Sequence, residues 1–286
     1  MRPSDDQVPN LDVPSRLGTE ISVTGKWVPN APDGWFFRSE SSREMRAEWQ
    51  AIHDDAKAHD GVLSTEINHA VGEDAVLVHH VFASPEAMVD YIGSVAARHK
   101  GALTGVARPG LHLVRGVDIP DSVRTAIGTT GVAAAFGAYR YGWVKHDYRR
   151  PDPATAIQVT AKWTAREGHR RAELDRWWRT VAEDAWGLEE GLVRFEAYEV
   201  PGEEALIIHE TFTDTAVLRF HLTRGTANMY KKHLDEVSAP ECYFFRGPVS
   251  WDIRTYSRFM HLPATYTSQG SHFTVAEGTM SEGRVL

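Results

Sequence analysis

Apolar and polar residues alternate in some segments of this chain, which predicts strands. In the segments between them, apolar residues recur every three or four positions, which predicts helices. Alternation predicts a strand over 21–27, where Ile21, Val23 and Trp27 share one face. A helix is predicted from Ser41 to about His59, with Ser42 as its N-cap. The following segments predict strands over 62–69 and 75–82, a helix from the Ser84-Pro85-Glu86 start to about residue 100, and a strand over 111–115.

The same order of elements occurs a second time. The stretch 72–82 reads GEDAVLVHHVF, and 202–212 reads GEEALIIHETF. Residues 21–27 and 157–163 are identical at five of seven positions. Matching segments in the same order indicate a tandem duplication. The second copy predicts strands over 157–163, 192–199, 205–212 and 242–246, with helices over 169–186 and 214–235.

Each copy therefore reads strand, helix, strand, strand, helix, strand, the order of ferredoxin-like domains. We expect a loose arm over 1–18, a first repeat over 19–116, a linker over 117–156, a second repeat over 157–260 and a tail over 261–286. The linker offers an added strand near 139–143, and 251–259 is interpreted as a further strand. The fold class predicted is α+β, two ferredoxin-like repeats packed sheet to sheet as an intramolecular α+β barrel, because each sheet alone leaves one face uncovered.

Composition narrows the classes of function. The chain has 286 residues, 42% of them hydrophobic, and a net charge of −8 with a pI near 6.0. This balance argues against a surface for nucleic acid or an anionic membrane. No run reaches the ~20 apolar residues of a membrane span, and the N-terminus lacks a signal-peptide pattern, so we expect a cytoplasmic location. The single cysteine, Cys242, excludes an internal disulfide and reads as a buried structural thiol.

Several short motifs resemble the antibiotic-biosynthesis monooxygenase family. They are Glu190-Gly191-Leu192 before a strand, the Gly-acid-acid turn, the strand that ends in Phe, the Ser84-Pro85-Glu86 helix start and Phe220-His221-Leu222. The resemblance covers roughly 20–116 and 157–260, as pattern rather than as a catalytic signature. It implies the dimeric α+β barrel and oxidation of polycyclic phenols or anthrones by O2, often without metal or flavin.

The tandem form resembles oxygenases that open a ring of angucycline-type polyketides. That likeness implies no tightly bound cofactor, O2 as co-substrate and reduced flavin (FADH2) as a diffusible reductant. The partners expected are a small aromatic substrate and a flavin reductase, with no nucleic acid and no membrane. The chain is expected as a monomer with an internal pseudo-dimer, or as a homodimer.

Strand alternation identifies the main candidates for catalysis. Val78, His80 and Phe82 share one face of a strand, and Glu210 and Phe212 share the corresponding face in the second copy. If the Phe residues line the barrel, His80 and Glu210 point into a cavity. His80 suits a base that forms a phenolate, and a carboxylate in apolar surroundings could also carry a proton. The structural alternative is a His and a Glu hydrogen-bonded between packed sheets.

The remaining candidates have weaker support. His79 and His209 occupy the same place in both copies, which favours a structural role over catalysis. The candidates for substrate binding are aromatic residues of the strands, two residues at matching places in predicted helices, and an arginine at a strand end. They are Trp27, Trp163, Phe82 and Phe212; His221 and Tyr91; and Arg246. For the aromatic residues the alternative is core packing, and for the arginine it is a surface ion pair.

The sequence was also compared with the spacing of known metal and cofactor motifs. The 14 histidines show neither His-x-His nor His-Glu-x-x-His spacing, so no metal site is predicted. A Gly-rich dinucleotide fingerprint is absent from the sequence. The function expected is an oxygenase acting on a polycyclic aromatic polyketide in antibiotic biosynthesis. Two alternatives stay open: a non-catalytic barrel that binds a hydrophobic small molecule, and a haem-dependent enzyme whose single axial His the sequence would not reveal.

Overall fold

The computed structural model describes residues 11–12, 18–30, 40–145, 152, 154–267 and 271–274. The arm expected over 1–18 lies almost wholly outside these residues. The chain divides into two compact units. The first unit comprises Thr19–Val114, Ile119–Ala134 and the C-terminal Gly270–Leu286, and the second comprises Met1–Gly18, Arg115–Asp118 and Ala135–Gln269. The mixed α+β class predicted from the sequence is confirmed.

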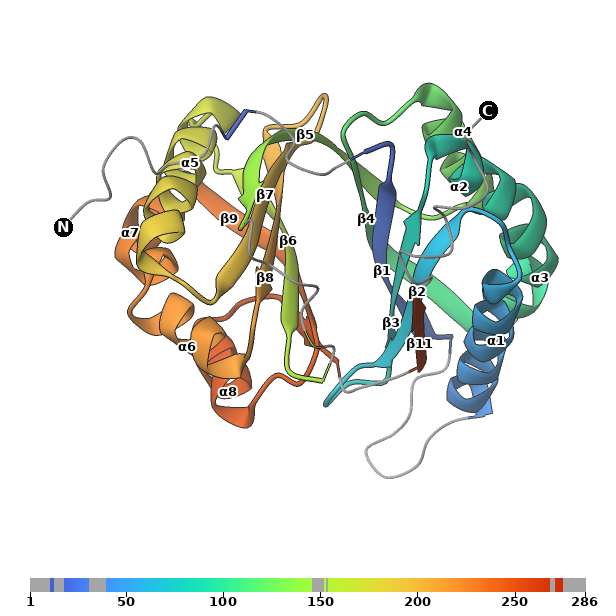
Figure 1. The fold of residues 1–286 in the computed structure, drawn as a ribbon. Coiled ribbons are helices and arrows are strands. Elements are labelled where there is room, and N and C mark those ends of the chain that lie inside the picture. Colours follow the sequence, from blue (N-terminus) through green and yellow to red (C-terminus); the bar gives the residue numbers. More distant parts are fainter. Residues whose placement is uncertain are drawn as a thin grey trace. The chain divides into compact units, whose positions relative to one another are not determined.

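The first unit is a sheet covered on one face by helices (Figure 1). Its strands are β1 (Ile21–Pro29), β2 (Val62–His69), β3 (Val76–Phe82), β4 (Ala107–Gly116) and β11 (Ser271–Thr274), in the order β4-β1-β3-β2-β11. Its helical segments are α1 (Glu40–Lys57), α2 (Pro85–Tyr91), the π-helical turn η2 (Ile92–Ala96), α3 (Ala97–Val106) and α4 (Asp121–Thr130). Helix α1 packs on the sheet through residues three or four positions apart, such as Met45, Trp49 and Ile52.

The second helical run of this unit begins as predicted. Ser84 has an extended backbone and its hydroxyl accepts a hydrogen bond from the Ala87 backbone N–H at 3.2 Å, with Pro85 in the first turn. The run then widens into the π-helical turn η2 before continuing as α3. Single π-turns inside helices are frequent at functional sites. This one lies over the sheet beside the cavity described below.

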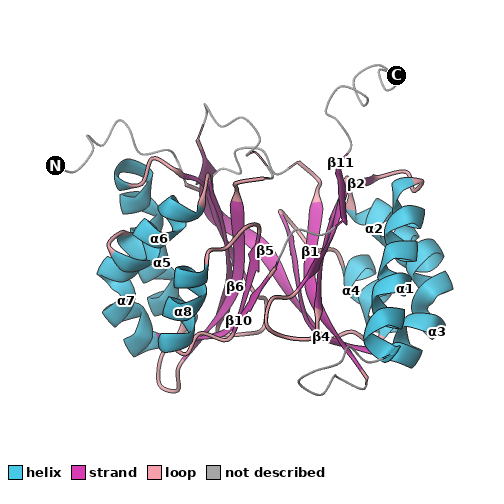
Figure 2. Ribbon diagram, turned by 90° about the horizontal axis from the view of Figure 1, so that it is seen from below, coloured by secondary structure: helices cyan, strands magenta, loops and turns pink. Residues whose placement is uncertain are grey.

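The second unit has the same layering (Figure 2). Its strands are β5 (Ala134–Val144), β6 (Ile157–Ala165), β7 (Leu192–Glu199), β8 (Ala205–Phe212), β9 (Ser238–Arg246) and β10 (Ala264–Tyr266), in the order β10-β9-β6-β8-β7-β5. Its helices are α5 (Arg171–Leu188), α6 (Thr215–Thr223), α7 (Thr226–Val237) and α8 (Trp251–Phe259). In both units the order β-α-β-β-α-β is observed, and the central antiparallel pairs have matching registers. Val23 lies opposite His80, and Val159 lies opposite Glu210.

Two local predictions, the strand over 251–259 and the Ser42 N-cap, need correction, and elements in the linker and the tail were not predicted. The segment 251–259 is helix α8, not a strand, because Ile253 and Ser257, four residues apart, are the positions it buries. Part of the linker is helix α4, which buries Val123 and Ile127 at the same spacing. Ser42 lies inside α1, where its hydroxyl donates to Asp74 instead of capping the helix. The tail contributes β10, parallel to β9, and β11, antiparallel to β2.

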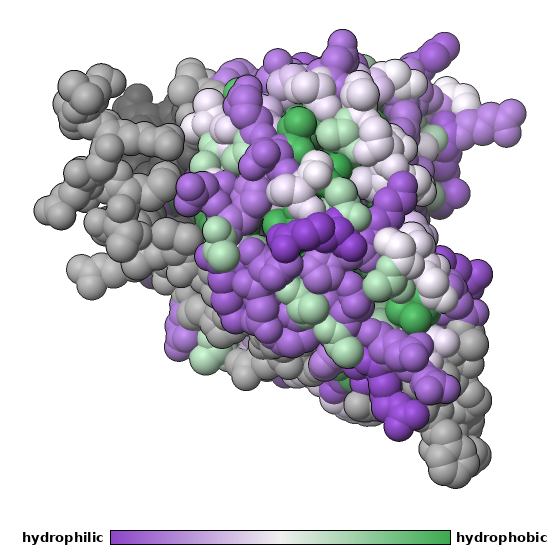
Figure 3. Space-filling view, turned by 90° about the vertical axis from the view of Figure 1, so that its right-hand side faces the viewer, coloured by the Kyte–Doolittle hydropathy of each residue, from purple (hydrophilic) through white to green (hydrophobic). Residues whose placement is uncertain are grey.

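Two surface properties bear on function. None of the helices in the described part of the chain combines the length and the apolar character that crossing a membrane requires. The helix-covered side of the first unit shows mostly hydrophilic residues with small apolar areas between them (Figure 3). A broad apolar docking patch is therefore absent from the described residues visible on that face.

Candidate functional site

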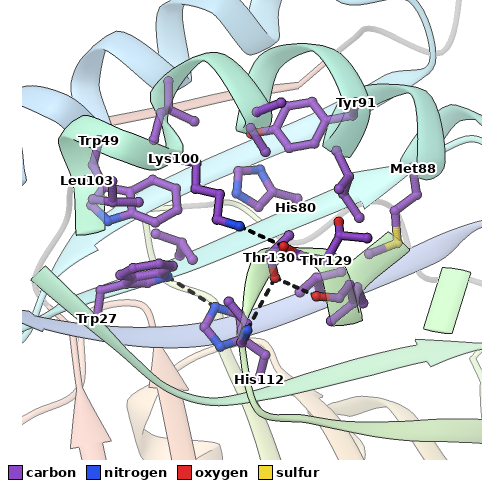
Figure 4. Close-up of a pocket in the computed structure, with 18 of the residues that line it drawn as sticks. Trp27, Trp49, His80, Met88, Tyr91, Lys100, Leu103, His112, Thr129 and Thr130 are labelled. Carbon is purple, nitrogen blue, oxygen red and sulfur yellow. Dashed lines mark hydrogen bonds between the residues drawn. The ribbon is translucent and has the colours of Figure 1, made fainter. Parts of the chain in front are cut away.

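The first unit encloses a cavity of about 370 Å³ between its sheet and its helices (Figure 4). Strands β1, β3 and β4 form its floor, and α1, the run from α2 to α3, and α4 with the segment after it form its walls. Most of the lining is aromatic or aliphatic, and the residues that carry the argument are Trp27, Trp49, His80, Tyr91, Lys100 and His112. A volume of this order lies at the lower end of the range for small-molecule sites.

His80 is the polar residue that β3 directs into this cavity. It is 5% exposed, and its ring lies 5.5 Å from the Tyr91 ring and 6.1 Å from the Trp49 ring, centroid to centroid. Its Nδ1 is 3.1 Å from the Thr65 hydroxyl, which leaves Nε2 as the nitrogen available to a ligand. Burial, aided by nearby His112 and His53, lowers the pKa of His80 to about 3. The imidazole is therefore neutral at physiological pH.

His112 on β4 is a second neutral imidazole in the lining. Its Nε2 accepts a hydrogen bond from the Trp27 indole N–H at 3.1 Å, and its Nδ1 is 3.0 Å from the Gly110 carbonyl oxygen. This pair of partners assigns the proton to Nδ1. Burial lowers the pKa of His112 to about 4, against the opposing effect of the Gly110 carbonyl. A Cβ at Gly25 would lie 2.1 Å from the His112 ring, so glycine in β1 makes room for it.

Tyr91 on α2 completes the polar lining near His80. Its ring packs 5.1 Å from that of Phe82, and it is 5% exposed. Burial raises the pKa of the Tyr91 phenol, so the hydroxyl stays protonated. His80, Tyr91 and His112 are therefore all neutral, and the inner cavity is polar at a few points without carrying charge.

The corresponding place in the second unit is built differently. His221 on α6 contacts two carboxylates, with Nδ1 2.8 Å from Glu189 and Nε2 3.2 Å from Glu210. The Glu189 carboxylate also accepts hydrogen bonds from the backbone N–H and the hydroxyl of Thr226, at 2.7 and 2.6 Å. Despite full burial, the two carboxylates raise the pKa of His221 to about 10. We call Glu189, His221 and Glu210 the buried ion triad.

Space beside the buried ion triad is small. The cavity there is about 60 Å³ and is lined partly by Trp163, Glu210 and His221. Phe212 is fully buried, with its ring 5.1 Å from His221. Trp163 packs edge to face on Trp178 at 5.3 Å, just as Trp27 packs on Trp49 at 5.5 Å. The aromatic framework is thus shared, whereas the open space lies in the first unit.

The structure separates the candidates of the sequence into three groups. His80, Trp27, Phe82 and Tyr91 meet in the large cavity, and Glu210, Trp163 and His221 meet beside the small one. The large cavity lies between the sheet and helices of one unit, so the space that His80 points into is lined by helices as well as by strands. Phe212 packs against His221, and the other three candidates, His79, His209 and Arg246, line neither cavity.

His79 and His209 lie on the opposite face of their strands. Their Nδ1 atoms are 2.9 and 3.0 Å from the hydroxyls of Thr24 and Thr160, which is the shared structural pattern expected from their symmetry. Arg246 is buried and donates to Gln158 on the same face, so it does not lie at the surface, as the ion-pair alternative required. Neither histidine nor the arginine lines either cavity.

Four residues of these sites were missed. Trp49, Lys100 and His112 line the large cavity, and Glu189 belongs to the buried ion triad. The signal for Trp49 was its spacing from Met45 and Ile52 in an amphipathic helix. No local pattern marks His112 or Glu189, because their roles depend on partners 85 and 32 residues away.

Metal and thiol chemistry find little support in the described residues. There, no group of three or more His, Cys, Asp or Glu side chains is arranged to hold a metal ion. Cys242 in β9 is half-buried, and desolvation raises its thiol pKa to about 11. A thiol with that pKa is a poor nucleophile at neutral pH.

Comparison with known proteins identifies the fold. No protein-family model matches the sequence, and no curated protein matches it. Among solved structures, a candidate monooxygenase from Fusobacterium nucleatum subsp. nucleatum aligns with a TM-score of 0.52 and 8% identity, over 91% of this chain and 100% of its own. An anthrone oxidase-like protein aligns with a TM-score of 0.50 and 10% identity, over 91% of this chain and 94% of its own. At these identities the likeness shows a shared α+β fold.

Proposed function

We propose that this chain is an oxygenase that binds a flat aromatic phenol or hydroquinone, of the polyketide type, in the cavity of the first unit. The observation that carries the proposal is the cavity itself: about 370 Å³, lined by Trp27, Trp49, Phe82 and Tyr91, with the imidazole of His80 directed into it. The names of the two solved structures, a candidate monooxygenase and an anthrone oxidase-like protein, support the reaction class.

The role proposed for His80 is that of proton acceptor. Because its pKa is about 3, the imidazole is always in the basic form but holds a proton weakly. It accepts the phenol proton only when the phenolate stays beside it, since the two opposite charges then stabilise each other in the apolar cavity. The phenolate is electron-rich and transfers electrons to O2. Oxidation of a ring CH2 to C=O consumes one O2 and releases one water, with no external reductant.

A reaction that inserts one oxygen atom of O2 into the substrate and reduces the other to water needs two electrons from an external reductant. For such a reaction we propose reduced flavin (FADH2), delivered by diffusion from a flavin reductase. Haem fits the described residues poorly for two reasons. Its two propionates would need cationic partners, and Lys100 is the one cation among the described residues that line the cavity. A histidine that ligates a metal usually bonds a carboxylate or carbonyl through its other nitrogen, whereas Nδ1 of His80 contacts a hydroxyl.

The two units are proposed to derive from a tandem duplication within one chain. The matching registers Val23 opposite His80 and Val159 opposite Glu210 support this history. Under it, the first unit kept the reaction cavity and the second filled its counterpart with the buried ion triad. The chain would then act as a monomer with an internal pseudo-dimer.

The test is O2 consumption with a polycyclic hydroquinone, with and without FADH2, corrected for protein-free oxidation. His80→Gln should lower kcat about 100-fold, a typical contribution of acid–base catalysis, while the Kd of the aromatic changes little. His79→Gln is the matched control, because His79 directly precedes His80 on β3 and faces away from the cavity. Tight binding without O2 uptake by the wild type would replace this proposal with a binding protein.

A further inference from the structure

The mouth of the large cavity carries one charge, on Lys100 of α3. Among the described residues that line the cavity, Lys100 is the one with a cationic side chain, since His80 and His112 are neutral. Lys100 is exposed, whereas Trp27, Tyr91 and His112 are buried, so it lies at the entrance rather than in the interior. Its side chain extends toward Thr129 and Thr130 (Figure 4).

The Lys100 ammonium is held in place without being neutralised. Its Nζ donates to the main-chain carbonyl of Thr129 near the end of α4, at 2.7 Å. An ammonium has three N–H donors, and this bond uses one. On α1, the carboxylates of Glu48 and Asp55 are both bonded to His99, at 2.6 and 2.9 Å.

Five of the other six lysines differ in this respect; the sixth, Lys145, also donates to main-chain carbonyls, those of Glu189 and Glu190. Most pair with a carboxylate: Lys26 with Glu73, Lys57 with Asp54, Lys162 with Glu203 and Glu241, Lys231 with Asp235, and Lys232 with Glu236. Within the described residues, Lys100 forms no ion pair. A positioned cation without a counter-ion, at the entrance of an uncharged apolar cavity, is the arrangement that recognises an amphipathic anion.

We propose that the substrate is an aromatic acid: a polycyclic ring system that enters the cavity and carries a carboxylate that Lys100 binds at the mouth. The proposal rests on the proposed function for the identity of the cavity and adds the class of substrate. The ring packs against Trp27, Trp49 and Tyr91, and the carboxylate stays at the wet entrance, where its desolvation cost is small. Lys100 thereby fixes which end of the ring system points toward His80.

The experiment compares two probes of the same shape, anthracene-2-carboxylate and anthracene-2-carboxamide, by anthracene fluorescence without any turnover. Wild-type protein should bind the carboxylate about tenfold more tightly, as expected for one charge-assisted contact at a partly exposed site. In Lys100→Met the two Kd values should become equal, and Lys100→Arg should keep most of the preference. Lys57→Met, an exposed lysine on α1 outside the cavity lining, is the matched control.

A second measurement needs no variant and so does not depend on how Lys100→Met folds. The carboxylate preference of the wild type should fall as ionic strength rises, because an exposed pair is screened. Equal binding of the two probes by wild type, or a preference unchanged in Lys100→Met, would overturn the role of Lys100 while leaving the cavity as the aromatic site. Absence of binding by both probes would remove the cavity as a site, and the proposed function with it.

Discussion

The buried ion triad of the second unit should make the stability of the protein depend on alkaline pH. The perturbation is a rise in pH from about 6 to about 10, in wild type and in His221→Gln. The pKa of His221 is about 10 in the fold, against a reference of 6.5 in the unfolded chain. A raised pKa stabilises the fold fully below pH 6.5, and this stabilisation is lost as pH rises toward 10.

The magnitude follows from the same two pKa values. At about 1.4 kcal/mol for each pH unit, they set an upper limit of about 5 kcal/mol on the contribution of the proton held by His221. Removing one member of a buried charge cluster usually costs about 3–5 kcal/mol. At pH 6, His221→Gln should therefore lower the unfolding free energy by about 3 kcal/mol, because Glu189 and Glu210 lose the cation between them.

The assay is denaturant unfolding of both proteins at a series of pH values. The gap between wild type and His221→Gln should shrink as pH rises from 6.5 to 10, and taking this difference cancels other groups that titrate in the range, such as Cys242. His169→Gln removes a partly exposed His–Glu pair on the same unit and should cost less than about 0.5 kcal/mol at every pH. A gap that stays constant up to pH 10 would show that the triad does not hold a proton on His221.

Three further outcomes are expected. kcat/KM should not fall as the pH is lowered from 8 to 5, because the pKa of His80 is about 3. A fall in kcat/KM with an apparent pKa near 6.5 that disappears in His80→Gln would contradict this. Gly25→Ala should lower the unfolding free energy by about 1–3 kcal/mol, measured by denaturant titration, since its Cβ overlaps the His112 ring, whereas Gly93→Ala, with open space around it, is the control. Cys242 should react with iodoacetamide slowly at pH 7.5 and faster as pH approaches 11; rapid labelling of the native protein at pH 7.5 would refute the raised pKa.

The strands were predictable because alternation identifies both a strand and its two faces. In β3, the alternate positions Val78, His80 and Phe82 do share the face that lines the cavity. The segment 251–259 misled because its large aromatics, Trp251 and Phe259, are 72% and 78% exposed and bury nothing in the described fold. In that segment the informative pair was Ile253 and Ser257, whose spacing is that of a helix.

The site was predictable only as far as local patterns reach. Alternation placed His80 on a cavity-lining face, but it could not say that the cavity lies under α1 to α4 of the same unit. The tautomer of His112 depends on Trp27, and its space depends on Gly25, both on another strand. The lowered pKa of His80 also depends on burial by side chains distant in sequence, which no local pattern shows.

The difference between the two units follows from what burial demands of charge. A buried carboxylate or imidazolium needs charged partners. His221 accordingly lies between Glu189 and Glu210, the Thr226 hydroxyl donates to Glu189, and about 60 Å³ of space remains. Neutral His80 and Tyr91 at the corresponding positions need fewer partners, and about 370 Å³ stays open beside them. On a similar aromatic framework, the unit with neutral polar residues therefore has the larger cavity. A site that needs room for a substrate fits the first unit, where His80, Tyr91 and His112 are neutral.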